Sequence, residues 1–245
     1  MAIYEKPKVR VSGGYVVHVE ICNEVSLQCN RLVHALYYTL LKNKESGELR
    51  GVEEIVPAYS SLSILYDPRV ISKDEILRKV DEAWNVATSV DVSKILRPRK
   101  FRIPVVYGGK YGPDLESVAQ YAKLDPEEVI SIHTSKGYVC YMLGFTPGFI
   151  YLGDVDDRIA APRLPNPRTK VPAGSVGIAG KQTGVYGVDS PGGWRLIGRT
   201  PLKMFDPKRE PPTPIRPGDV VEFYRINEED FEKLKGKFVG EVMES

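Results

Sequence analysis

The chain has 245 residues, of which 42% are hydrophobic, enough to bury the core of one large domain or two small ones. This composition excludes disordered and fibrous proteins. Because 34 basic residues nearly balance 32 acidic ones, no overall field attracts nucleic acid or an anionic membrane. The opening "MAIYEKPKVR" lacks the apolar core of a signal peptide, and no membrane-length apolar run follows, so we expect a cytoplasmic protein.

The first part of the chain predicts a small α/β layer. Residues 15–21 ("YVVHVEI") favour a strand, residues 26–42 carry apolar side chains at helical spacing, and residues 52–67 predict two strands joined by a short turn. Ser72 and Glu75 form a capping box that opens a second helix. With one more strand over residues 101–106, the βαββα order predicts a ferredoxin-like, split βαβ domain.

Glycine and proline mark a boundary between two domains. Only four of the 22 glycines and three of the 19 prolines precede residue 98. The composition changes within residues 97–109, so we expect an α/β domain over residues 1–96 and a second domain over residues 97–245. The fold class is therefore α+β.

The second domain is predicted to be mostly β. Two short helices come first, capped by Asp114 and by Asp125. Short β-like runs separated by Gly/Pro turns then fill residues 137–224, a pattern typical of a barrel or sandwich. Residues 227–237 predict a closing helix capped by Asn227.

The cysteines and histidines give little sign of a metal site. Cys22, Cys29 and Cys140 lie in apolar stretches without Cys-x-x-Cys spacing, so we expect three inert core thiols. His133 stands at the end of a predicted element, where it either titrates near neutral pH or bonds to backbone groups. No second His or Cys lies at ligand spacing, so no metal is expected. The three glutamines are few beside abundant Lys and Glu, a bias that accompanies thermophily.

No familiar catalytic motif is present. Residues 174–182 ("GSVGIAGKQ") resemble a phosphate loop, but five residues separate the glycines where four are needed, and Gln182 replaces the Ser/Thr that binds magnesium. Ser190 is a weak candidate nucleophile, because Ser-Pro is ordinarily a turn and Asp189 is no established base.

Two stretches carry candidate binding residues. Residues 144–154 ("GFTPGFIYLGD") alternate glycines with aromatic residues, of which Phe149 is expected in the core and Phe145 in a site. Residues 161–175 place Arg163 and Arg168 among prolines, which restrain the backbone and so favour bidentate binding of a carboxylate. Arg168 is the preferred anion clamp, and a solvated surface arginine is the alternative.

The sequence resembles the KipI / allophanate hydrolase subunit 1 family, which includes the B subunit of 5-oxoprolinase. The resemblance rests on "GFTPGFIYLGD", on "PRTKVPAGSVGIAGKQTGVYGVDSPGGWRLIGRTP" and on "PGDVVEF", and it covers essentially the whole chain. It implies a small α/β domain followed by a cyclophilin-like β-barrel.

The resemblance also implies partners and a reaction. Together with a KipA-like C subunit and a LamB/YcsF-like A subunit, such a chain opens 5-oxoproline to glutamate with ATP. This chain has no nucleotide-binding motif and no biotin-accepting lysine, so we expect it to hold no cofactor and to be inactive alone, with ATP used by the assembled complex. The alternatives are an inhibitor of a sensor histidine kinase and, on fold analogy alone, a prolyl isomerase.

The expected substrate-binding residues combine local chemistry with this resemblance. Glycines bring backbone N–H groups close to a ligand, Gln182, Tyr186 and Arg168 orient amide and carboxylate groups, and Trp194 forms a wall. The full set is His133, Phe145, Arg168, Gln182, Tyr186, Gly192, Gly193 and Trp194. The catalytic residues stay unassigned.

Overall fold

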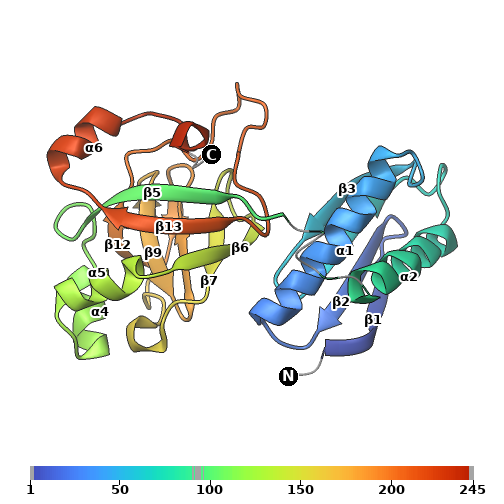
Figure 1. Cartoon of the computed structure of the whole chain (residues 1–245), viewed down its shortest axis with the longest axis horizontal. Coiled ribbons are helices and arrows are strands. Elements are labelled where there is room, and N and C mark those ends of the chain that lie inside the picture. Colours follow the sequence, from blue (N-terminus) through green and yellow to red (C-terminus); the bar gives the residue numbers. More distant parts are fainter. Residues whose placement is uncertain (1–2, 90, 92–94, 96, 243–245) are drawn as a thin grey trace. The chain divides into compact units, whose positions relative to one another are not determined.

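The computed structural model describes residues 3–89, 91, 95 and 97–242. The chain divides into two compact units, Met1–Pro98 and Arg99–Ser245, and each has its own hydrophobic core. Figure 1 shows a helix-covered sheet in the first unit and a barrel in the second. No helix among the described residues is both long enough and apolar enough to pass through a lipid bilayer.

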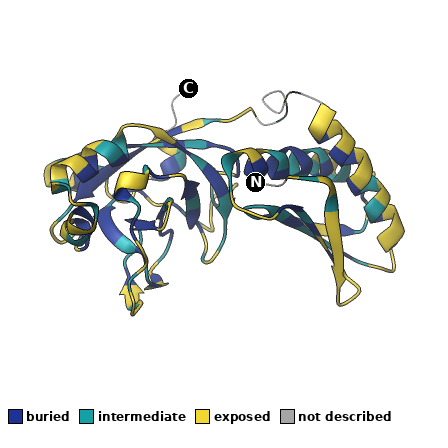
Figure 2. Cartoon of the chain, turned by 90° about the horizontal axis from the view of Figure 1, so that it is seen from below, coloured by how far each residue is buried: buried dark blue, intermediate teal, exposed yellow. Residues whose placement is uncertain are grey.

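The first unit is a four-stranded antiparallel sheet with two helices. The sheet order is β1-β2-β4-β3. The strands are β1 (Ile3–Ser12), β2 (Val16–Cys22), β3 (Val52–Pro57) and β4 (Ser61–Tyr66), and the helices are α1 (Leu27–Glu45) and α2 (Lys73–Ser89). Both helices lie over one face of the sheet, and their inward sides are buried (Figures 1 and 2).

One edge strand of this sheet differs from the prediction. The strand beside β2 is β1, from the amino-terminal end of the chain, whereas β5 (Lys100–Tyr107), which the sequence assigns to this layer, belongs to the barrel. β1 escaped prediction because most of its residues are exposed and it carries Pro7 and several charges. Charged residues and proline are typical of an edge strand, which must resist pairing with other chains.

The second unit is a closed barrel of seven strands in the order β10-β7-β6-β13-β5-β12-β9. Besides β5, its strands are β6 (Gly137–Leu143), β7 (Ile150–Gly153), β9 (Ser175–Ala179), β10 (Gln182–Val185), β12 (Arg195–Arg199) and β13 (Val220–Arg225). β5 and β13 pair in parallel, and the other neighbours are antiparallel. Closure removes the open edges that a sheet otherwise presents.

Shorter elements surround the barrel. They are α4 (Leu115–Ala122), α5 (Pro126–Thr134), α6 (Glu228–Leu234), the 3-10 turns η1 (Asp157–Ile159) and η2 (Val239–Val242), and a two-stranded sheet of β8 (Arg168–Val171) and β11 (Ser190–Gly192). α4 contacts β12, and α5 contacts β13. The β8–β11 sheet lies outside the barrel ladder and carries much of the glycine-rich block.

The caps of the helices mostly follow the sequence. The side chains of Ser26, Ser72 and Asn227 each accept a backbone N–H at the start of α1, α2 and α6. Asp114 does not cap α4 with its side chain, so that prediction is wrong. Its carboxylate is instead engaged by β8 and β12, as described below.

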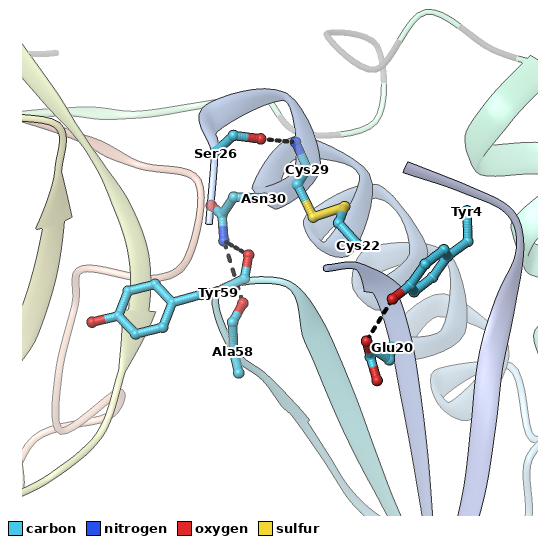
Figure 3. Close-up of a disulfide and its surroundings, with 8 residues drawn as sticks. All are labelled: Tyr4, Glu20, Cys22, Ser26, Cys29, Asn30, Ala58 and Tyr59. Carbon is cyan, nitrogen blue, oxygen red and sulfur yellow. Dashed lines mark hydrogen bonds between the residues drawn. A yellow bond between two sulfur atoms is a disulfide. The ribbon is translucent and has the colours of Figure 1, made fainter. Parts of the chain in front are cut away.

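Two of the three cysteines form a disulfide. Cys22, at the end of β2, bonds to Cys29 in the first turn of α1, with their Cα atoms 6.2 Å apart (Figure 3). The prediction of three free thiols is wrong for this pair, because the reversal between strand and helix brings the two cysteines together. Cys140 is free and buried as predicted, and burial raises the pKa of its thiol.

Candidate functional site

A pocket of about 250 Å³ lies at the glycine-rich block of the second unit, and we call it the aromatic pocket. It is lined by Phe145, Phe149, Tyr151, Arg163, Pro167, Tyr186, Pro191, Gly192, Gly193 and Trp194. Neighbouring strands bring these residues together, because β7 carries Tyr151 and pairs with β10, which ends just before Tyr186. The volume suits a ligand smaller than a typical drug molecule.

The aromatic rings of the pocket pack around Phe149. Its ring centroid lies 4.5 Å from that of Tyr151, 4.9 Å from Tyr186 and 5.3 Å from Trp194. The Tyr186 and Trp194 contacts are close to perpendicular, the edge-to-face geometry that aromatic pairs prefer. Phe149, Tyr186 and Trp194 are buried, so they form a rigid floor.

Phe145 lies at the open side of the same cluster. Its side chain is 61% exposed, and its ring contacts those of Phe149 and Tyr186 edge to face. Its φ of 64° is in the left-handed region, which is unfavourable for a residue with a bulky side chain. Such conformations persist where the surrounding structure imposes them, often beside ligands.

Gly192 is required for the packing of Tyr186. A Cβ atom on Gly192 would lie 2.3 Å from the Tyr186 hydroxyl oxygen, closer than atoms can approach. Burial raises the pKa of Tyr186, although a hydrogen bond from the backbone of Trp194 opposes the shift. The Tyr186 hydroxyl therefore keeps its proton and can donate it to a ligand.

Arg163 supplies the positive charge of the aromatic pocket. Its side chain is exposed, and no hydrogen bond or ion pair holds its guanidinium within the described part of the chain. Its charge acts on Tyr151 and Tyr186, lowering the pKa of each hydroxyl against the larger effect of burial. Arg163 thus faces the tyrosines and is available to an anion.

Arg168 lies outside the lining and grips a carboxylate of its own chain. Its Nη2 donates to Oδ1 of Asp114 at 2.7 Å, and its side chain is 30% exposed. The other oxygen of Asp114 accepts the backbone N–H of Leu196 at 2.7 Å. Arg168 thereby ties β8 to α4 and β12. Its Nη1 is buried without a hydrogen-bond partner among the described residues.

His133 is in the barrel core and not in the aromatic pocket. Its Nδ1 is 2.9 Å from the Tyr107 hydroxyl and its Nε2 is 2.9 Å from Oγ1 of Thr183. Because Thr183 donates its own proton to the Gly177 carbonyl, Nε2 is the protonated nitrogen and Nδ1 accepts from Tyr107. Burial lowers the pKa of His133 to about 3, so the prediction of titration near neutral pH is wrong.

The structure brings five of the eight predicted residues together. Phe145, Tyr186, Gly192, Gly193 and Trp194 line the aromatic pocket, whereas His133, Arg168 and Gln182 do not. Gln182 is the first residue of β10, where it pairs with Gly153 and Ala179. The residues not foreseen in the lining are Phe149, Tyr151, Arg163, Pro167 and Pro191. All five lie in the quoted stretches, and strand alternation in "FIYLG" could have indicated that Phe149 and Tyr151 share a face.

The described residues contain no nucleophile paired with a base. Ser190 is buried, and its Oγ has no hydrogen-bond partner among them. The neighbouring Asp189 accepts the Ala173 N–H and pairs with Lys170, so its carboxylate is already engaged. Over the same residues, no group of three His, Cys, Asp or Glu side chains could hold a metal ion.

Comparison with known proteins places this architecture in a family. Residues 7–215 match the family described as carboxyltransferase domain, subdomain C and D. The chain is 45% identical to the 5-oxoprolinase B subunit of Bacillus subtilis, covering 91% of this chain and 94% of that protein, and 44% identical to its counterpart of the same name from Escherichia coli O157:H7, covering 89% and 96%. A crystal structure of a conserved uncharacterized protein from Pyrococcus horikoshii is 45% identical, with a TM-score of 0.54, covering 91% of this chain and all of that one. The chain therefore belongs to the carboxyltransferase family of subdomains C and D, and within it to the B subunits of 5-oxoprolinase.

Proposed function

We propose that the chain is the B subunit of a heteromeric, ATP-dependent 5-oxoprolinase that opens 5-oxo-L-proline to L-glutamate. The observation that carries this proposal is the 45% identity to a 5-oxoprolinase B subunit over 94% of that protein's length. The relatives' names describe subunits, which supports a complex of several chains. They lend no support to a kinase inhibitor.

The site supports a binding role for this chain within such a complex. The described residues offer no paired nucleophile and base, whereas the aromatic pocket is a formed binding site. Opening a lactam with ATP needs an activated carbonyl and groups that stabilise the developing charge. We propose that KipA-like and LamB/YcsF-like subunits complete these functions, that the complex uses the ATP, and that the seven-stranded barrel is of the cyclophilin-like type.

The aromatic pocket fits the chemistry of 5-oxoproline, a small flat lactam with one carboxylate. The rings of Trp194 and Phe149 offer flat apolar walls to the five-membered ring. Arg163, free of any described partner, can bind the carboxylate through two parallel hydrogen bonds. The Tyr186 hydroxyl, which accepts from the Trp194 backbone, has a proton left for the lactam carbonyl.

The protein is proposed to act in the cytoplasm. A disulfide is rare in cytoplasmic proteins of mesophiles but common in those of hyperthermophiles. The Cys22–Cys29 bond and the scarcity of glutamine are together consistent with a thermophilic source.

The test is reconstitution with the two companion subunits. The purified chain alone should form no glutamate from 5-oxoproline and ATP, and activity should appear only when all three subunits are combined. Omitting each subunit in turn is the control. Glutamate formation by the isolated chain, or no activity from the full set although each subunit is folded, would contradict the proposal.

A further inference from the structure

A second cavity of the barrel unit, of about 500 Å³, has a chemistry unlike that of the aromatic pocket, and we call it the basic pocket. It lies between the turn after β5, the segment after β12, and α6. Its lining is Lys110, Tyr111, Ala173, Gly187, Arg199, Thr200, Pro201, Leu202, Lys203, Phe205, Phe231, Glu232 and Lys235. None of these residues lines the aromatic pocket, although Tyr186 and Gly187 are adjacent and face different cavities.

The basic pocket carries an excess of positive charge. Four of its lining residues are cationic and one, Glu232, is anionic, an excess of three in a chain whose whole net charge is +2. Lys110 and Lys235 are paired with exposed glutamates on α6. Among the described residues, Arg199 and Lys203 have no carboxylate partner. Their charges are available to an anionic ligand.

Arg199 is held in place for such a role. Its Nε donates to the Ala173 carbonyl at 2.9 Å, which fixes the plane of the guanidinium, and its side chain is half-buried. No described residue accepts a hydrogen bond from its two Nη groups. A guanidinium fixed at one edge loses little freedom when its remaining N–H groups bind phosphate oxygens.

The opposite part of the lining is aromatic. The Tyr111 and Phe231 rings lie 4.8 Å apart at a 47° tilt, and the Lys110 ammonium is 5.0 Å from the centre of the Tyr111 ring. Phe231 is buried, whereas Tyr111 is partly exposed in the cavity. Flat heterocyclic rings pack against such aromatic groups.

From this arrangement we propose that the basic pocket binds a nucleoside polyphosphate. Arg199 and Lys203 bind the phosphates, and the base packs against Tyr111 and Phe231. This assignment departs from the expectation that the chain holds no nucleotide, which followed from the absence of a phosphate loop; side-chain cations take the place of that loop here. Because it concerns binding by the isolated chain, it stands apart from the proposed reaction.

The experiment is calorimetric titration of the purified chain with ATP, inorganic tripolyphosphate and adenosine. ATP should bind at one site, tripolyphosphate more weakly and adenosine more weakly still. Lys203→Gln should weaken ATP binding about tenfold or more, the effect of losing one charge-assisted contact. Lys181→Gln removes the same charge from an exposed lysine that lines neither pocket, and should leave binding unchanged.

Tyr111→Leu separates the two halves of the proposed site. It should weaken ATP binding while leaving tripolyphosphate binding unchanged, and thermal melting checks that each variant is folded. The proposal is overturned if ATP does not saturate one site, if Lys203→Gln and Lys181→Gln act alike, or if tripolyphosphate binds as tightly as ATP. Since no companion subunit is present, these results are independent of the activity assay.

Discussion

Acidification should destabilise the barrel unit through His133. The imidazole is fully buried, and burial lowers its pKa in the folded chain to about 3, against an ordinary value near 6.5. Between these values the unfolded chain binds a proton that the folded chain does not. The free energy of unfolding therefore falls as the pH falls, and the stability is fully present only above the unfolded pKa.

The size of the effect follows from the two pKa values. From pH 7 to pH 5 the unfolded chain becomes almost fully protonated at His133 while the folded chain stays neutral there, which costs about 2 kcal/mol. His133→Gln is the matched control, because an amide can still bond to Tyr107 and Thr183 but does not titrate. The lowered carboxylate pKa values of Asp67 and Asp156 are common to both proteins and cancel in the comparison.

The assay is urea unfolding followed by tryptophan fluorescence at pH 7, 6 and 5. The chain has two tryptophans, one in each unit, so a Trp84→Phe background leaves Trp194 to report on the barrel unit alone. The parent should lose about 2 kcal/mol more than His133→Gln across this range. Equal losses in the two proteins would refute the assignment of His133 as a buried neutral imidazole.

Three further predictions concern the residues around the aromatic pocket. Arg168→Ala should lower the free energy of unfolding by about 2 kcal/mol, less than for a fully buried pair because Arg168 is 30% exposed, and a urea midpoint equal to wild type would contradict the ion pair with Asp114. Arg163→Gln should leave unfolding unchanged but raise the KM of the assembled enzyme for 5-oxoproline about tenfold, and an unchanged KM would remove Arg163 from the site. Gly192→Ala should cost about 1–3 kcal/mol in thermal unfolding by displacing Tyr186, whereas Gly193→Ala, with its nearest contact at 3.5 Å, should be nearly neutral.

Local signals in the sequence predicted most helices and the inner strands. Ser26 and Asn227 mark helix starts because a side-chain oxygen beside the first N–H groups needs only its immediate neighbours. Asp114 carries the same signal, yet its carboxylate binds Arg168, 54 residues later, and Leu196. A cap can be recognised locally, but a competing long-range partner cannot.

The candidate site was only partly predictable for the same reason. Composition pointed to the glycine-rich block, and five predicted residues do line one pocket. The choice between Arg163 and Arg168 depended on which of them meets Asp114, a contact between distant segments. The disulfide was missed in a similar way, because the geometry of the turn between Cys22 and Cys29 decides whether two apolar-flanked cysteines meet.

The parallel pairing of β5 with β13 has a consequence for biosynthesis. β13 lies between β5 and β6 in the barrel, yet it follows β5 by more than a hundred residues and lies beyond residue 215, where the family match ends. Until β13 has left the ribosome, the nascent chain has open edges on both β5 and β6, and such edges invite pairing with other chains. A fragment that stops with the family match would keep these edges permanently, so its aggregation would report a missing strand and not a failure of the rest of the fold.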